Sequence, residues 1–348
     1  MVEALTQWAK QHATWLGNIQ SARFPGEGGS SYNLLFKTDG PSGNNEFVAK
    51  LGALAPHLVT FPDEDLERQR RVMGLTRDRA HVPAPEVLCH EDDASWLGAP
   101  FFVMPRYEGR PWPSDPPYNY SGWVIDSSAE ERQEMEDAFV DVLVKIHSID
   151  VDGADLDFLA TPERGSGSSA LAGQVRYLEH YYAWSRGKWT FPLLERALTW
   201  LRGNIPSRQD SACVTWGDSR VGNLLFVGTS VTAVLDWECA GLGYPEVDLA
   251  FAEVMHAYYQ DRAVSDGRAG LPRQFEGATM AQTYMDRGGR SIGDLHWYRV
   301  LAAARAAAIQ VRFICRPVPG QQPVGDIGDS RITIRPLLTR LLDGSDTP

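Results

Sequence analysis

The segment from residue 214 to residue 238 constrains the fold of this chain more than any other stretch of its 348 residues. Two short runs, 223–227 and 231–235, are rich in the apolar residues typical of β-strands, and Gly228-Thr229 lies between them. A glycine in a short connection between two such runs predicts a β-hairpin. The hairpin would bring the residues at its two open ends, Asn223 and Asp236, close together.

The polar residues around this hairpin have the spacing of a phosphoryl-transfer site. Asp218 precedes Asn223 by five positions, in the loop that leads into the hairpin. Phosphoryl transfer needs an oriented hydroxyl group, and it needs Mg²⁺ to neutralise charge on the phosphate oxygens. We expect Asp218 to be the catalytic base, and we expect Asn223 and Asp236 to offer Mg²⁺ the hard oxygen ligands that it prefers. The alternative is a hairpin whose turns carry ordinary aspartate and asparagine residues.

Three motifs resemble the aminoglycoside phosphotransferase family, small-molecule kinases with a protein-kinase-like fold, and in particular its broad bacterial phosphotransferase branch. They are Trp-Gly-Asp-Ser-Arg-Val-Gly-Asn at 216–223, Val-Leu-Asp-Trp-Glu at 234–238, and Gly-Tyr-Pro-Glu-Val-Asp-Leu-Ala at 243–250. The likeness covers nearly the whole chain. The family usually has His where this chain has Trp216, and in related kinases that His braces the loop, so an indole there is compatible with activity.

The resemblance implies an α+β, two-lobed fold. The N-lobe, residues 1–105, would combine an antiparallel sheet with a helix and bind the nucleotide. The C-lobe, residues 106–348, would be mostly helical and hold the catalytic loop and the acceptor-binding helices. Apolar positions at helical spacing independently predict a helix over 130–147, and another is expected over about 294–312.

The first third of the chain predicts a binding site for nucleotide phosphates. A turn with little side chain can approach phosphates closely, and such a turn is expected at Gly28, Gly29, Ser30 and Ser31. The strand that ends at Val48-Ala49-Lys50 resembles the kinase strand whose lysine reaches the α- and β-phosphates. The alternative for Lys50 is an ordinary surface lysine.

A glutamate from the following helix should hold Lys50. This helix is expected within residues 62–75, where Glu64 and Glu67 lie about one turn apart. We favour Glu67, and Gln69 aligns where the family often has glutamate.

The segment 100–109 resembles the last N-lobe strand and the hinge between lobes. Adenine would dock against the backbone of about residues 103–107, so Met104 and Arg106 are expected nucleotide contacts. Pro105 removes one hydrogen-bond donor from this segment.

Aromatic residues gather between positions 175 and 189, where the resemblance implies a helical insert that builds the acceptor pocket. Tyr181 and Trp184 are expected to contact the acceptor, because aromatic walls suit a ring, an apolar face or an ammonium group. The alternative is that they are core residues of a helical pair. Trp237 and Glu238, which follow Asp236, are the other expected acceptor contacts.

Charge and composition limit the partners of the chain. The net charge is −12, and without a basic stripe a nucleic-acid partner is not expected. The acidic balance favours a cationic or neutral acceptor. The sequence has no apolar stretch of membrane-spanning length and no secretion signal at its N-terminus, so we expect no membrane partner and a cytoplasmic location. The four cysteines are dispersed and have no zinc-binding spacing.

The sequence therefore predicts a kinase that uses ATP or GTP with Mg²⁺ to phosphorylate a hydroxyl group of a small molecule. A nucleotide-binding pseudokinase with a regulatory role is the alternative, motivated by Trp216. A protein kinase is disfavoured, because the His-Arg-Asp, Asp-Phe-Gly and Ala-Pro-Glu motifs are missing. His147 and His256 are expected to be structural, and Asp248 is expected to tie its helix to the catalytic loop.

Overall fold

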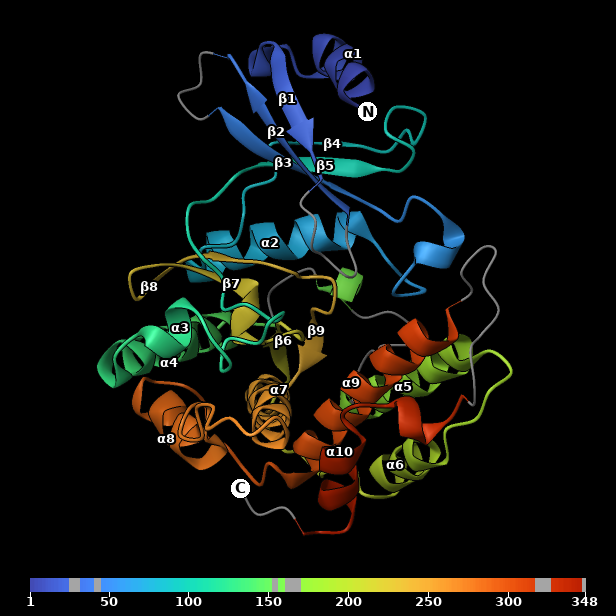
Figure 1. Cartoon of the computed structure of the whole chain (residues 1–348), viewed down its shortest axis with the longest axis vertical. Helices are drawn as coiled ribbons and strands as arrows, with labels where there is room; N and C mark the ends of the chain where they lie inside the picture. Colours follow the sequence, from blue (N-terminus) through green and yellow to red (C-terminus); the bar gives the residue numbers. More distant parts are fainter. Residues whose placement is uncertain (25–31, 41–44, 152–155, 160–169, 317–326, 346–348) are drawn as a thin grey trace.

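The computed structural model describes residues 1–24, 32–40, 45–151, 156–159, 170–316 and 327–345 (Figure 1). Gly28, Gly29, Ser30 and Ser31 lie outside the described residues. Their predicted contact with phosphates therefore stays a prediction.

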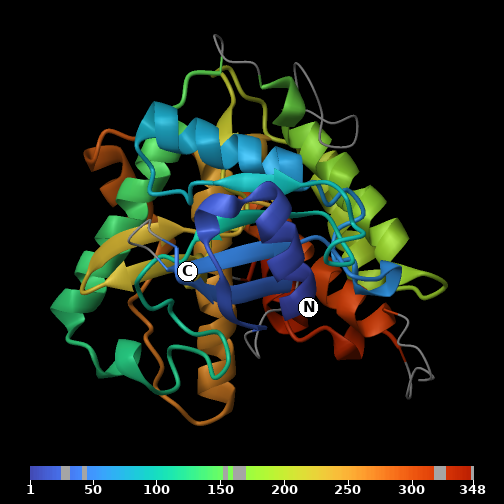
Figure 2. The same cartoon turned by 90° about the horizontal axis from the view of Figure 1, so that it is seen from above.

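The N-terminal part is an antiparallel sheet of five strands in the order β1-β2-β3-β5-β4. The strands are β1 (Ile19–Arg23), β2 (Tyr32–Thr38), β3 (Glu46–Leu51), β4 (Cys89–Glu91) and β5 (Phe101–Pro105). Helix α1 (Val2–His12) packs on the sheet through Leu5 and Trp8, and Figure 2 shows this helix lying over the strands. Helix α2 (Leu66–Ala80) runs between the sheet and the rest of the molecule (Figure 1). The sheet ends at Pro105, which agrees with the lobe boundary expected at 105/106; the boundary itself stays a prediction.

The C-terminal part is mostly helical. Its helices are α3 (Trp123–Asp126), α4 (Ala129–His147), α5 (Ala170–Arg186), α6 (Pro192–Gly203), α7 (Pro245–Ser265), α8 (Gly277–Asp286), α9 (His296–Cys315) and α10 (Arg335–Leu342). Two small antiparallel ladders join β6 (Cys213–Thr215) with β9 (Gly241–Gly243) and β7 (Leu224–Val227) with β8 (Ser230–Val234). Short 3-10 helices occur at Thr14–Leu16, Pro56–Leu58, Asp157–Leu159, Val221–Asn223 and Asp329–Arg331.

Elements with a clear local pattern of apolar residues in the sequence were predicted well. The hairpin is confirmed as β7 and β8, and the helix expected over 130–147 is confirmed as α4, whose first turn has a capping box made by Ser128 and Glu131. The helix expected within residues 62–75 is α2, which begins at Leu66 and ends at Ala80. It begins at Leu66 because the side chain of Asp65 accepts a hydrogen bond from Arg68 N at 3.0 Å and caps the helix there.

His256 on α7 is buried in the C-terminal part and has a structural environment, as expected. Its Nδ1 lies 2.6 Å from the hydroxyl of Tyr118, and its Nε2 lies 2.9 Å from the carbonyl oxygen of Leu271. A carbonyl can only accept, so Nε2 donates and Nδ1 accepts from Tyr118. Burial lowers the pKa of His256 from 6.5 to about 4, and the ring is therefore neutral at pH 7.

This burial should make folding stability fall as the pH drops. Between pH 6.5 and about 4 the unfolded chain binds a proton at His256 that the folded chain does not bind. The free energy of unfolding should thus lose on the order of 3 kcal/mol from this group across that window. We expect His256→Gln, which cannot take up the proton, to flatten that dependence, as measured by urea unfolding at pH 7 and pH 5. An equal change in the free energy of unfolding with pH in the two proteins would contradict the lowered pKa of His256.

Candidate active site

The loop that carries Asp218 is fixed by one buried carboxylate. Asp248, near the start of α7, is fully buried, and its two oxygens accept hydrogen bonds from the backbone N–H of Trp216 at 2.7 Å and of Gly217 at 2.8 Å. His147, at the end of α4, places its Nε2 3.0 Å from the same carboxylate. The expected role of Asp248 as a scaffold acid is confirmed.

Gly217 gives this loop a conformation that a side chain would prevent. Its φ is +86°, and a Cβ at this position would lie 2.2 Å from the carbonyl oxygen of Cys239. Glycine is the residue that tolerates both the positive φ and the close approach. The loop therefore lies directly against the turn that follows Asp236.

Trp216 connects the Asp218 loop to the Asp236 segment. Its indole is fully buried, and Nε1 donates a hydrogen bond to the carbonyl oxygen of Leu235 at 2.9 Å. Leu235 immediately precedes Asp236, so the indole supports the backbone that presents that carboxylate. Trp216 thus braces the loop, the role expected for the residue at this position.

Asn223 and Asp218 contact each other directly. The Asn223 side-chain amide donates to the Asp218 backbone carbonyl at 2.9 Å and to its carboxylate at 2.8 Å. The backbone carbonyl of Asn223 accepts a bond from Leu235 N at 2.8 Å. The Nε of Arg220 donates to the same carboxylate oxygen of Asp218 at 3.3 Å. These contacts place Asp218, Asn223 and Leu235, the residue before Asp236, next to one another.

The sheet contributes Lys50 to the same point. Lys50 is 5% exposed, and its ammonium lies 3.3 Å from a carboxylate oxygen of Asp236, which has a φ of +54°. Burial lowers the pKa of Lys50, but the negative charges of Asp236, Glu238 and Glu64 outweigh it and raise the pKa overall. The lysine is therefore charged, and it links the N-terminal sheet to the C-terminal part of the chain.

The two glutamates near the start of α2 lie in different surroundings. The carboxylate of Glu67 accepts two bonds from Arg70, at 2.6 and 2.5 Å, on the exposed side of the helix. Glu64 is partly buried. This burial raises the pKa of its carboxyl, and the charge of Lys50 opposes that rise. The contacts of the described residues thus do not bring Glu67 to Lys50, because α2 begins after Glu64 and turns Glu67 outward. The neighbouring Gln69 is buried, at 1% exposure.

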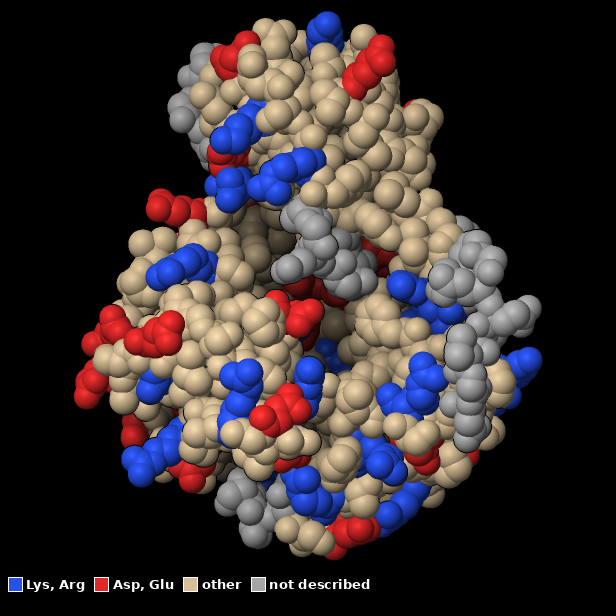
Figure 3. All heavy atoms as spheres, in the orientation of Figure 1, with Lys and Arg blue, Asp and Glu red and all other residues tan. Residues whose placement is uncertain are grey.

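A cleft of about 400 Å³ opens between the sheet and the helical part, beside Lys50 and Asp236. Figure 3 shows a hollow between these two parts of the molecule. The residues that line the cleft include Met104 and Arg106, the predicted nucleotide contacts. They also include Trp237, which was predicted to contact the acceptor. The backbone N–H of Arg106 donates to the Glu46 carbonyl at 2.9 Å.

The other predicted acceptor contacts are spread over the C-terminal part. Trp237 is buried, and its indole donates to the Val234 carbonyl at 2.8 Å. Glu238 is also buried, and its backbone carbonyl accepts a bond from Arg68 at 3.1 Å. Trp184 lies under the guanidinium of Arg312, which is 4.2 Å from the ring centroid.

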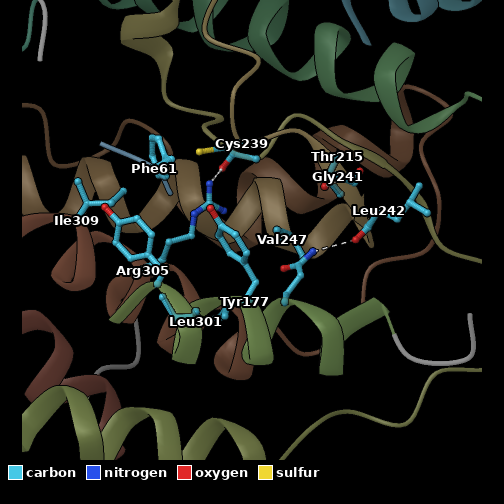
Figure 4. A pocket seen from close by; sticks show the side chains of 14 residues that line it. Phe61, Tyr177, Thr215, Cys239, Gly241, Leu242, Val247, Leu301, Arg305 and Ile309 are labelled. Carbon is cyan, nitrogen blue, oxygen red and sulfur yellow. Dashed lines mark hydrogen bonds between the residues drawn. The ribbon is translucent and has the colours of Figure 1, made fainter. Parts of the chain in front are cut away.

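Tyr181 lines a second, smaller pocket beside the Asp218 loop, and Figure 4 shows this pocket from close by. This pocket lies between α5, α9 and the ladder of β6 and β9, and Gly217 forms part of its wall. Phe61 and Arg305 also line it, and neither was expected. Arg305 had one signal in the sequence: it is a single charged residue within the small-residue run 302–308. Phe61 lies in a connecting segment without a motif.

Solved structures of phosphotransferases have the same fold as this chain. A protein of Ralstonia eutropha, described as a candidate aminoglycoside phosphotransferase, has a TM-score of 0.68 at 23% identity, and the match covers 99% of this chain and 97% of that one. A thermostable mutant of aminoglycoside phosphotransferase APH(4)-Ia, in a ternary complex with AMP-PNP and hygromycin B, has a TM-score of 0.59 at 14% identity over 98% and 97% of the two chains. The expected protein-kinase-like α+β fold is confirmed.

A curated relative is the mouse protein named acyl-CoA dehydrogenase family member 10. It is 30% identical over 269 residues, which is 74% of this chain and 23% of the mouse protein. The chain thus spans about a quarter of the length of that relative. Among the helices of the described residues, none is long and apolar enough to cross a bilayer.

The model of the phosphotransferase enzyme family matches residues 21–283, from β1 to α8. This range contains Lys50 and Asp236, which line the cleft, and it contains Asp218 and Asn223, which contact each other beside the segment that leads into Asp236. The chain belongs to the phosphotransferase enzyme family.

Proposed function

We propose that this protein is a kinase that transfers the γ-phosphoryl group of ATP or GTP to a hydroxyl group of a small molecule. The observation that carries the proposal is the ion pair between Lys50 and Asp236, whose Nζ and carboxylate oxygen lie 3.3 Å apart. This pair lies near the hydrogen bond between Asn223 and Asp218. The Lys50 cation and the Asp236 carboxylate thus line the cleft, and Asn223 and the Asp218 carboxylate lie beside the segment that leads into Asp236. These are the parts that phosphoryl transfer requires.

The residues of the cleft fit a nucleotide bound with Mg²⁺. The Asn223 side chain donates two hydrogen bonds to Asp218 through its nitrogen, which leaves its carbonyl oxygen as a ligand. Asp236 accepts from Lys50 through one oxygen, which leaves the second oxygen for the ion. Mg²⁺ held by these two side chains would neutralise charge on the phosphate oxygens. Lys50 would bind nucleotide phosphates, and Met104 and Arg106 would contact the base and sugar end of the nucleotide.

Asp218 would act on the acceptor. Its carboxylate would orient the acceptor hydroxyl towards the γ-phosphorus and take its proton as the new bond forms, while the nucleoside diphosphate leaves. Asn223 and Arg220, which both contact this carboxylate, would hold its orientation. Glu64, within the electrostatic reach of Lys50, would keep the lysine in place. Glu67 is not needed for this role.

Trp216 motivated the pseudokinase alternative, and its geometry supports catalysis instead. Its indole donates to the Leu235 carbonyl next to Asp236. One neutral hydrogen bond contributes about 1 kcal/mol, so we expect Trp216→Phe to lower kcat by about fivefold to tenfold and leave nucleotide binding unchanged. Stopped-flow measurement of single-turnover phosphorylation would check this. Trp216→His should recover part of the lost rate. An unchanged rate in Trp216→Phe would show that the hydrogen bond of the indole does not contribute to catalysis.

The proposal is tested by nucleoside diphosphate release. Purified protein with Mg²⁺ and either ATP or GTP would be assayed against aminoglycosides, macrolides, amino alcohols and sugars, with Asp218→Ala as the blank. We expect release that depends on one acceptor class and disappears in the variant. Nucleotide binding without acceptor-dependent release across all classes would favour the pseudokinase.

A further inference from the structure

We propose that the small pocket beside the Asp218 loop binds an uncharged, apolar portion of the acceptor, and that both lobes build it. This inference rests on the proposed kinase function and names the class of its acceptor. The pocket adjoins the reaction site, because Gly217 and Thr215 line it and Gly217 directly precedes Asp218. Consecutive Cα atoms lie about 3.8 Å apart, so an acceptor seated there has its hydroxyl end close to the base.

The walls of the pocket are chiefly apolar and aromatic. Tyr177, Leu178 and Tyr181 come from α5, and Leu301 and Ile309 come from α9. Figure 4 shows Tyr177, Leu301 and Ile309 among the side chains of this wall. None of the described residues that line the pocket is Asp or Glu. Such walls favour hydrocarbon by removing it from water.

The charged residue of the pocket is a cation. Arg305 donates a hydrogen bond to the Gly217 carbonyl at 2.6 Å, and its guanidinium lies 4.9 Å from the Phe251 ring centroid. A cationic acceptor group placed here would meet this like charge and would lose its hydration without a carboxylate partner. The net charge of −12 favours a cationic or neutral acceptor as a whole, and the pocket selects the neutral kind for the part that it encloses.

The N-lobe supplies the roof of the pocket. Phe61, 8% exposed, packs against Tyr181 with a distance of 5.5 Å between ring centroids. The connecting segment before α2 is held to the helical part by Tyr181, whose hydroxyl donates to the Thr60 carbonyl at 3.0 Å, and by Arg312, whose Nε and Nη2 donate to the Val59 carbonyl at 2.8 and 2.6 Å. An acceptor in this pocket therefore touches the lobe that binds the nucleotide.

The size of the pocket sets the size of the apolar portion. Its volume is about 60 Å³, and a water-sized group occupies roughly 10–15 Å³ by this measure. The pocket thus has room for about four to six such groups. A short alkyl chain or one small ring fits, whereas a large ring system would have to remain outside.

The test uses straight-chain 1-alkanols from propanol to decanol as probes, with the full chain and saturating ATP analogue AMP-PNP. Dissociation constants would be measured by ligand-observed NMR. Each methylene buried contributes about a fourfold gain in affinity, so we expect this gain for successive alkanols up to about six carbons and little gain beyond. Asp218→Ala should keep the same gain in affinity for each methylene, because the alkyl chain and not the hydroxyl group fills the pocket, and its loss of diphosphate release is a separate result that reports on the kinase function alone.

Two variants locate the binding. Gly241 lines the pocket, and a Cβ there would meet no heavy atom within 4 Å, so Gly241→Leu should fill the pocket without backbone strain and abolish the dependence on chain length. Phe61→Ala should weaken alkanol binding by opening the roof. Phe313→Ala, at an exposed position on the same helix as Arg305, is the matched control and should bind as the unmodified protein does.

The outcome can overturn the proposal in three ways. Affinity that does not change with chain length would exclude an apolar pocket for the acceptor. The same would follow if chain-length dependence persisted in Gly241→Leu. Tighter binding of the polyamine hygromycin B than of octanol, lost in Gly241→Leu, would assign the pocket to cationic acceptors.

Discussion

Replacing Asp236 by alanine is expected to abolish phosphoryl transfer, with a fall in kcat of about a thousandfold or more. Asp236 supplies a proposed ligand for Mg²⁺, and its carboxylate is also the partner of the buried Lys50 ammonium at 3.3 Å. The variant would lose the charge that holds the ion and leave Lys50, at 5% exposure, without its nearest counterion. Steady-state release of ADP or GDP with a responsive acceptor measures the effect.

A matched control separates this loss from a general effect of removing a carboxylate. Asp343 forms an exposed ion pair with Arg196 at 2.6 Å, and surface pairs of this kind contribute about 0–1 kcal/mol. Asp343→Ala should therefore keep its full turnover. Substantial transfer activity in Asp236→Ala would show that the metal assignment is wrong.

The second large effect is expected for stability, at Asp248. Asp248→Ala removes the shared acceptor of Trp216 N, Gly217 N and His147 Nε2, and all these donors are buried. Removing one partner from a buried hydrogen-bonded charge typically costs about 3–5 kcal/mol. We expect a loss of that order in the free energy of unfolding, together with loss of activity, because the backbone before Asp218 would no longer be held.

Urea unfolding followed by fluorescence would measure the loss at Asp248. Asp286→Ala provides the comparison, since Asp286 lies at the exposed end of α8 and contacts Gln282. That variant should change stability by less than about 0.5 kcal/mol. A similarly small change for Asp248→Ala would contradict the anchoring role of its carboxylate.

The sequence predicted the centre of the site because its parts are local. Asp218, Asn223 and Asp236 lie within one short segment, and a hairpin with a glycine turn brings its ends together without information from elsewhere. Lys50 was also predictable, because a strand that ends in Val-Ala-Lys resembles a known phosphate-binding element. The confirmed role of Asp248 followed from a motif that the resemblance covers.

The partner of Lys50 was harder to predict. Residues 63–67 contain four acidic side chains, at 63, 64, 65 and 67, and any of them could precede or begin the helix. Which glutamate lies near Lys50 depends on which of these acidic residues caps α2. Once Asp65 accepts from Arg68 N, Glu67 falls on the exposed side, and Glu64 stays with the buried lysine. The spacing of the residues in the sequence does not show whether Glu64 or Glu67 lies near Lys50.

The roof of the small pocket beside the Asp218 loop could not be predicted from sequence for a different reason. The contacts that hold residues 59 and 60 against α5 and α9 end on backbone carbonyl groups, and every residue has such a group. Tyr181 and Arg312 therefore give no indication of which segment they bind. Their partners are set by how the connection between β3 and α2 crosses the helical part, which is a long-range feature of the fold.

The most direct test of the kinase assignment is to follow the γ-phosphoryl group itself. Protein, Mg²⁺ and ATP labelled with ³²P at the γ position would be incubated with the acceptor class that responds in the release assay, and the products would be separated and identified by ³¹P NMR. The account predicts that the label appears in a phosphomonoester of the acceptor, and that Asp218→Ala forms none. Label found solely in inorganic phosphate, or equal transfer by Asp218→Ala, would contradict a phosphotransferase that uses Asp218 as its base.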